Sequence, residues 1–138
     1  MKEKFTYGKL FFAFSIAIVT FFAAESVSAQ IETAAAKRLT PAIKVNGSIG
    51  GEAHDSYVIR AVKGKTMTVE LSWIPEEENR AEFTVSQSSD FFSGEAVKFG
   101  KSTYDGKRWT GRIPKTGDYY FYVVAHPSAD YTIKVSFK

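Results

Sequence analysis

The chain contains no cysteine, and it has only two histidines and four prolines among its 138 residues. Without cysteine the protein has no disulfide bond to hold its fold, no thiolate nucleophile and no sulfur ligand for a metal. Neither His54 nor His126 belongs to a pair at the spacing of metal ligands, so the sequence predicts no metal site and no cofactor. Stability must come from an apolar core, and aromatic residues make up 15% of the chain.

Long apolar runs are also scarce, and the longest lies near the N-terminus. Three lysines precede the apolar stretch from Leu10 to Ala24, and the small-x-small sequence Val27-Ser28-Ala29 follows it. This order is typical of a secretory signal peptide with its cleavage site. The stretch is shorter than the roughly 20 residues that a membrane-spanning helix requires. We therefore expect residues 1–29 to be a cleaved signal peptide, with no permanent membrane anchor, and the mature protein to be periplasmic or extracellular.

Charge of one sign does not dominate the rest of the chain. Residues 1–29 hold three of the 18 basic and two of the 15 acidic residues, which leaves 15 against 13 and a net charge of +2 in residues 30–138. This balance does not indicate a nucleic-acid partner. The length of the mature part is that of one domain with a single core.

Helical periodicity is missing, and short alternating segments take its place. After Pro41 these segments are separated by turn residues at intervals of about 8 to 12, as in antiparallel sandwiches. The clearest alternation places Met67, Val69 and Leu71 on one face of a strand. The predicted strands are Ala42 to Ile49, Asp55 to Val62, Thr66 to Trp73, Ala81 to Ser86, Lys107 to Ile113, Tyr119 to Ala125 and Tyr131 to Phe137.

The fold prediction is an all-β protein with a single antiparallel β-sandwich of seven or eight strands and jelly-roll or Greek-key connections. This domain covers residues 41–138, and residues 30–40 are expected to be a flexible N-terminal arm. Lys63-Gly64-Lys65 fits the tight turn of a hairpin between the second and third strands. Between Ser86 and Lys107 the alternation fades, which predicts a long loop with at most one irregular strand. Trp73 and Trp109 are predicted to be core residues because each lies on an apolar strand face.

Catalysis finds little support in the sequence. His54, Asp55 and Ser56 include the residue types of a nucleophilic triad, but neighbours on a strand point to alternate sides and cannot form the relay. No G-x-S-x-G turn is present. The acidic run from Glu76 to Glu78 follows Pro75 and is typical of a solvated loop. The sequence therefore favours a protein that binds without catalysing a reaction.

The first candidate binding surface is Thr116-Gly117-Asp118-Tyr119, called the corner below. It precedes an aromatic strand whose two faces are both apolar. We expect Gly117 to supply a backbone conformation that other residues avoid, and Asp118 to form a hydrogen bond within the turn. Two interpretations remain open: the corner only begins the strand, or it also contacts a partner, as loops at the ends of sandwiches often do.

The second candidate surface consists of Arg108 and Arg112. On a strand these two arginines share one face, while Trp109 points to the other. Two arginines in line can hold carboxylate or phosphate groups bidentately, so an anionic cell-wall polymer is a candidate partner. A solvated sheet face explains the same residues without a partner, and this alternative also stays open.

Three stretches together carry a family resemblance. They are Asn46 to Tyr57, with NGSIG followed by DSY, Lys63 to Val69, and Trp109 to Tyr119. Their order resembles the bacterial pre-peptidase C-terminal type of β-sandwich domain and, among its small stand-alone relatives, the periplasmic inhibitors of goose-type lysozyme. The resemblance covers about residues 41–138. Because it rests on turns and core positions, it is more specific for fold than for activity.

The resemblance implies a function for the corner. In those inhibitors a Ser-Gly-x-Tyr loop is associated with entry into the substrate cleft of the lysozyme, and the corner matches its last three positions with Thr116 in place of serine. The loop from Ala125 to Ala129 departs from them, because it is short and uncharged where theirs is longer and basic. The hypothesis is a non-catalytic binding module that blocks a goose-type lysozyme or another envelope protein. The alternative is a structural or adhesive cell-envelope domain that binds a polymer or a surface protein.

Overall fold

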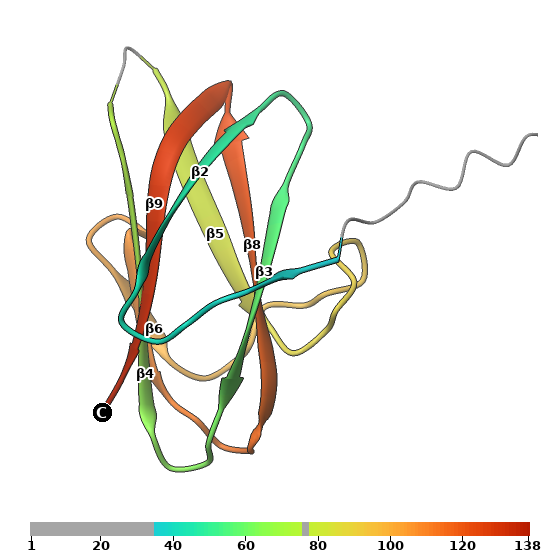
Figure 1. Ribbon diagram of the computed structural model, residues 1–138, viewed down its shortest axis with the longest axis vertical. Helices are drawn as coiled ribbons and strands as arrows, with labels where there is room; N and C mark the ends of the chain where they lie inside the picture. The colour runs from blue at the N-terminus through green and yellow to red at the C-terminus, as the bar shows by residue number, and fades with distance from the viewer. Residues whose placement is uncertain (1–34, 76–77) are drawn as a thin grey trace, which may run out of the picture. The chain divides into compact units, whose positions relative to one another are not determined.

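The computed structural model describes residues 35–75 and 78–138, so the predicted signal peptide lies outside the described residues. Two sheets face each other across a shared core (Figure 1). The first sheet has the strand order β1-β3-β8-β5, and the second has the order β2-β9-β4-β7-β6. The strands are β1 (Lys37–Arg38), β2 (Lys44–Gly50), β3 (Asp55–Ala61), β4 (Thr66–Trp73), β5 (Arg80–Ser86), β6 (Lys101–Thr103), β7 (Arg108–Arg112), β8 (Gly117–His126) and β9 (Ser128–Phe137).

The prediction of an all-β sandwich is confirmed, with nine strands instead of seven or eight. Each predicted segment overlaps one strand, and the two additional strands are β1 and β6, of which β6 lies in the long loop where one irregular strand was expected. These have two and three residues, too few for alternation to mark them in a sequence. The described residues contain no α-helix, and nothing among them is a helix that would span a membrane.

The alternation in β4 and β9 places the core between the two sheets. Met67, Val69 and Ile133 of the second sheet are fully buried, as is Phe121 of β8 in the first sheet. The ladder sets Val69 opposite Val135, so the inner faces of neighbouring strands share one apolar layer. Each side chain of this size stabilises the fold by about 1.5 to 3 kcal/mol when it leaves water.

The connections between strands differ from one expectation. Among the described strands, β6 and β7 are the one successive pair in a common ladder, and every other step along the chain crosses to the opposite sheet. The predicted hairpin at Lys63-Gly64-Lys65 is therefore wrong, because β3 pairs with β8 whereas β4 pairs with β7 and β9. Gly64 does adopt a positive φ of 88°. A tight turn of this kind reverses the chain but does not decide which strands then pair.

The described part of the expected N-terminal arm is packed against the first sheet. Lys37 and Arg38 form β1, which runs parallel to β3 at the sheet edge, so the sandwich is not purely antiparallel. Leu39 is only 6% exposed, and its backbone N–H donates to the carbonyl oxygen of Val58 at 2.8 Å. Residues 35–40 thus differ from a flexible arm, because one leucine among polar neighbours enters the core.

β8 lies inside the first sheet and is covered on both faces. Its inward residues include Tyr119 and Phe121, while Tyr122 points outward and is still only 2% exposed. The loop after β5 covers this tyrosine, because the Tyr122 hydroxyl donates to the Ser88 carbonyl and Phe91 packs edge-on against the Tyr122 ring. This packing explains why both faces of the strand are apolar in the sequence.

The two tryptophans lie at different depths. Trp109 of β7 is 6% exposed, and its ring fills the space that a Cβ would occupy at Gly100 or Gly111. Trp73 ends β4 at the margin of the core and is half-buried. Its indole N–H donates to the Asn79 carbonyl at 3.1 Å. The core prediction is confirmed for Trp109, whereas Trp73 packs at the edge.

Candidate functional site

The corner joins β7 to β8 at the end of the sandwich that also carries the β3–β4 turn. Two backbone hydrogen bonds of 2.8 Å tie the loops together, from Gly64 N–H to the Ile113 carbonyl and from Ile113 N–H to the Lys65 carbonyl. The exposed Thr116 adds a third contact, because its Oγ1 accepts a hydrogen bond of 2.9 Å from the Lys63 N–H. The two turns therefore form one surface.

Gly117 does not have the backbone conformation expected of it. It is the first residue of β8, pairs with Ala61, and its φ lies outside the left-handed region. A Cβ placed on Gly117 would meet no heavy atom within 4 Å. The expectation of a special backbone conformation is wrong at this position, and the fold tolerates a side chain there.

Asp118 lies on the outer face of the first sheet, directly opposite Arg60 in the ladder. Its carboxylate is 3.8 Å from the Arg60 guanidinium and 3.7 Å from that of Arg38 in β1. The expected hydrogen bond within the turn is replaced by these ion pairs with two other strands. At 34% side-chain exposure, Asp118 remains accessible to a partner.

Tyr119 anchors the corner from inside the sandwich. It is 0% exposed, and its hydroxyl donates to the Lys115 carbonyl at 2.8 Å and accepts from Gln87 Nε2 at 3.2 Å. Its ring also meets Phe99 edge-on at 6.1 Å between centroids. Tyr119 therefore holds the loop in place from below, and any surface for a partner consists of the residues before it.

Arg108 and Arg112 lie on the outer face of the second sheet, as the alternation predicts, but they are not equivalent. Arg108 is half-buried, with its Nε 3.9 Å from Glu70 Oε1. Arg112 is exposed at the end of β7, opposite Thr66, and is close in sequence to the corner. The structure thus groups Arg112 with the corner end and Arg108 with a separate part of the sheet.

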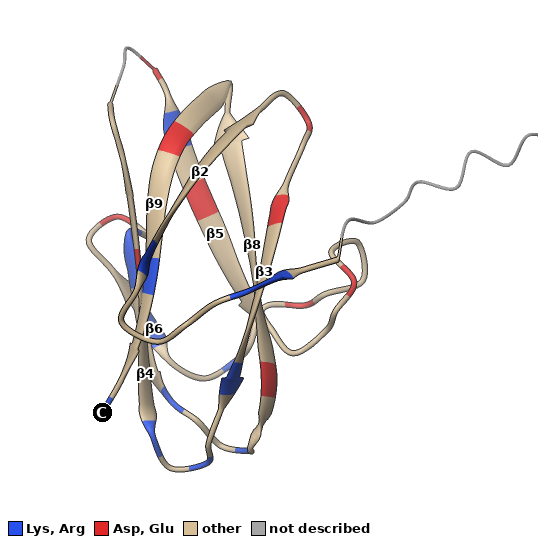
Figure 2. Ribbon diagram, in the orientation of Figure 1, with Lys and Arg blue, Asp and Glu red and all other residues tan. Residues whose placement is uncertain are grey.

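The corner end of the sandwich carries mostly positive charge. Lys63, Lys65, Arg112 and Lys115 are all exposed there, and Asp118 is the acidic residue beside them. Figure 2 shows basic residues in the turns at the lower end of the molecule, with an acidic segment on β8 just above. An exposed loop surrounded by cations favours an acidic partner.

A buried polar cluster lies between the sheets, away from the corner. The Tyr131 hydroxyl donates to the Asp55 carboxylate and lies 2.7 Å from the Tyr57 hydroxyl. Burial, together with these hydrogen bonds, raises the pKa of Tyr131 far above its ordinary value. Asp55 also lies 3.2 Å from Lys37 Nζ. This cluster links strands of the two sheets, because its side chains form hydrogen bonds and an ion pair with one another.

His54 and Asp90 make local contacts with the loop after β5. His54 stacks on Phe91 at 4.0 Å between ring centroids. Within residues 35–75 and 78–138, the acidic and histidine side chains form no group that could hold a metal ion. Asp90 accepts hydrogen bonds from the Ser93 hydroxyl and the Phe92 N–H of its own loop, and these bonds lower the pKa of its carboxyl.

Sequence reasoning missed the partners of Asp118 and a groove on the second sheet. Arg38 and Arg60 reach Asp118 from other strands, and only the ladder register places them there. The groove is lined by small polar residues that the sequence marks only as the outward positions of strands. Alternation gave the outward face of each strand, but which strands lie side by side has no local signal.

Comparisons with solved structures identify the same fold in bacterial proteins. The structure of PliG from Aeromonas hydrophila, a periplasmic inhibitor of g-type lysozyme, aligns with a TM-score of 0.60 and 23% identity over 75% of this chain and 96% of that one. PliG from Salmonella Typhimurium aligns with a TM-score of 0.52 and 16% identity over 75% and 99% of the two chains. The pre-peptidase C-terminal domain of a Bacillus anthracis collagenase aligns with a TM-score of 0.51 and 23% identity over 73% of this chain and 94% of that one.

At these identities the likeness establishes the shared fold. No protein-family model matches the chain, and neither does any curated protein. The resemblance read from the turns and core positions is thus confirmed as a structural one, to both kinds of protein.

Proposed function

We propose that the protein is an exported, non-catalytic inhibitor that blocks the substrate cleft of a goose-type lysozyme with the corner. Thr116, Gly117 and Asp118 form the contacting tip, Tyr119 anchors it, and Arg112 with the neighbouring lysines surrounds it. The arginine at position 108 lies apart, paired with Glu70, and is left out of this contact surface.

The observation that carries the proposal is the glycine at position 117. Glycine within a strand weakens the strand, and here neither backbone conformation nor lack of space calls for it. Glycine is also the residue that lets another molecule approach the backbone closely. A recognition role accounts for Gly117, whereas a corner that only begins a strand leaves it unexplained.

Two further features support the same proposal. Glycoside hydrolases carry a pair of carboxylic residues at the scissile bond, and the corner end offers the opposite charge through Lys63, Lys65 and Lys115. The solved inhibitors PliG share the fold over almost their whole length. Export through the predicted signal peptide would place the protein where such an enzyme attacks the cell wall.

The test is inhibition of bacterial cell-wall lysis by goose-type lysozyme. The wild-type protein should inhibit, and Gly117→Ala should raise the inhibition constant at least tenfold, about 1.4 kcal/mol, because its methyl group occupies the space of the approaching enzyme. Gly50→Ala is the matched control, since Gly50 lies at the opposite end of the sandwich and its Cβ would contact only Ser128 closely. Lack of inhibition by wild type, or equal inhibition by Gly117→Ala, would refute the proposal.

A further inference from the structure

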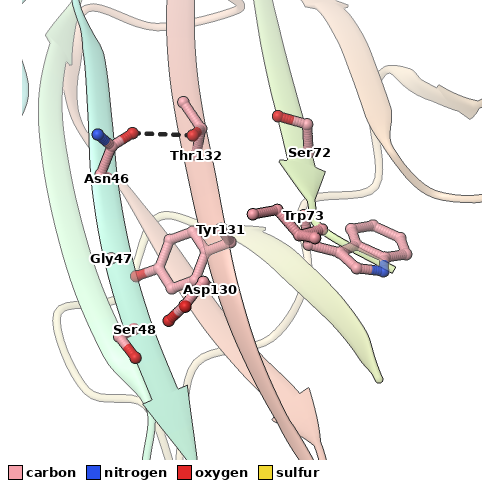
Figure 3. Close-up of a pocket in the computed structure, with 9 residues that line it drawn as sticks. Asn46, Gly47, Ser48, Ser72, Trp73, Asp130, Tyr131 and Thr132 are labelled. Atoms are coloured by element: carbon pink, nitrogen blue, oxygen red, sulfur yellow. Dashed lines mark hydrogen bonds between the residues drawn. The ribbon is translucent and has the colours of Figure 1, made fainter. Parts of the chain in front are cut away.

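The outer face of the second sheet carries a groove that the corner does not use. One hollow of about 650 Å³ extends from Ile74 and Asp130 to Ser72 and Thr132 (Figure 3). A second hollow of about 320 Å³ begins at the same Ser72 and Thr132 and continues to Lys134. Because the two share these lining residues, they form one continuous depression, called the sheet groove below.

One part of the sheet groove, called the neutral part, is lined by uncharged side chains apart from Asp130 at its end, and it is rich in hydrogen-bonding groups. The ladders place Asn46, Thr132 and Ser72 opposite one another across β2, β9 and β4. Thr132 Oγ1 donates to Asn46 Oδ1 at 2.8 Å, as Figure 3 shows, so the amide keeps its N–H donors for another molecule. Three neighbouring strands span roughly 10 Å. A row of short amide and hydroxyl groups on this scale suits the hydroxyl groups of a sugar.

The other part of the sheet groove is cationic. Two residues further along the same strands, Lys44 lies directly opposite Lys134, and Lys107 lines the same hollow. Glu70 is also opposite Lys134 but is shared with Arg108, 3.9 Å away. Like charges directly opposite each other in an antiparallel ladder destabilise it. An anion bound between Lys44 and Lys134 would remove this repulsion.

Aromatic residues border both parts of the sheet groove. Trp73 lines the neutral part, with Lys107 Nζ 4.4 Å from its ring centroid, and Tyr104 lines the cationic part. Tyr104 is 70% exposed and lies in the β6–β7 turn with a φ of 56°. Because an aromatic ring offers an apolar face beside a polar tip, it suits the apolar face of a sugar ring.

We propose that the sheet groove binds an anionic polysaccharide. Sugar hydroxyl groups bond to the row of Asn46, Thr132 and Ser72, and carboxylate or phosphate groups of the chain lie between Lys44 and Lys134. The carboxylate of Asp130 at the neutral end repels anions, which gives the bound chain a direction. This binding site is independent of lysozyme inhibition, since it lies on a sheet face and uses none of the corner residues.

The first experiment titrates the purified protein with three six-sugar probes and follows tryptophan fluorescence and calorimetry. The probes are an oligogalacturonate, a phosphorylated oligomannose and a neutral N-acetylglucosamine oligomer. At least one anionic probe should bind, with an affinity that falls as salt is added, and the neutral one should bind at least tenfold more weakly. Which anionic probe binds distinguishes carboxylated from phosphorylated polymers. Binding of neither, or of the neutral oligomer equally well, overturns the proposal.

The second experiment uses variants with the anionic probe that binds. Lys134→Gln should weaken binding at least fivefold and leave the thermal unfolding temperature equal or higher, because it removes the repulsion from Lys44. Lys98→Gln is the matched control, since Lys98 is an exposed lysine outside the sheet groove. Equal affinities of Lys134→Gln and wild type overturn the proposal. So does an oligothymidylate of the same charge that binds as tightly, because the surface would then recognise only negative charge.

Discussion

Trp109 and Trp73 occupy different depths, so their truncation should have different costs. Trp109→Ala should destabilise the protein by about 3 to 5 kcal/mol, because it empties a site enclosed by Phe99 and two glycines. Trp73→Ala should cost less, since half-buried Trp73 lies at the edge of the core. Urea denaturation of both variants measures the difference. Equal losses for the two variants would contradict the depths that the structure assigns.

The buried tyrosines should make the protein sensitive to alkali. Burial raises the pKa of Tyr131, and to a lesser extent those of Tyr57 and Tyr122, above the ordinary value near 10. The contribution of these raised pKa values to stability is complete below pH 10. It is lost progressively above pH 10, because the tyrosine hydroxyl groups of the unfolded chain lose their protons at lower pH than those of the folded protein. The unfolding temperature should fall between pH 10 and 11, and less steeply in Tyr131→Phe. An equal slope in Tyr131→Phe and wild type would contradict this effect of burial.

Among the elements, β1 is the one whose role is least visible in the sequence. Leu39, directly after β1, should behave as a core residue, so Leu39→Ala should cost about 2 to 5 kcal/mol in chemical denaturation. Ile43→Ala, four residues later at a 56% exposed position, serves as the control and should change stability little. If the Leu39→Ala variant were as stable as wild type, the prediction of a flexible arm would be supported instead.

Strands such as β4 and β9 could be predicted from the sequence because each repeats a two-residue pattern that packing requires. Val69 and Ile133 show this, since each is buried and its inward neighbours on the same strand are also apolar. The sheet to which each strand belongs could not be predicted. The residues of the turn at Gly64 would suit a connection between two strands of one sheet equally well as one between strands of different sheets. The candidate site was predicted only in part for the same reason. Its residues are local, but the ion pairs of Asp118 depend on a register between distant strands.

Across the whole molecule, the cations at the corner end should govern how fast a lysozyme is captured. In the double variant Lys63→Gln with Lys115→Gln, the association rate should fall several-fold at low salt while the dissociation rate changes little, because charges at the rim of an interface mainly steer encounter. Surface plasmon resonance at two salt concentrations separates the rates. Lys98→Gln with Lys44→Gln removes the same charge elsewhere, and an equal slowing in that control would argue against a local effect.

The place of β9 has a consequence for how the protein is made. β9 is the last strand of the domain to leave the ribosome, yet it lies between β2 and β4, and β2 has no other neighbour in its sheet. Chain emergence at about 5 to 20 residues per second therefore leaves β2 unpaired until β9 has emerged. The nascent chain should remain unfolded and accessible to chaperones during this time. Ribosome-stalled chains that end before Ser128 should be digested by protease, whereas chains in which β9 has fully emerged should resist it.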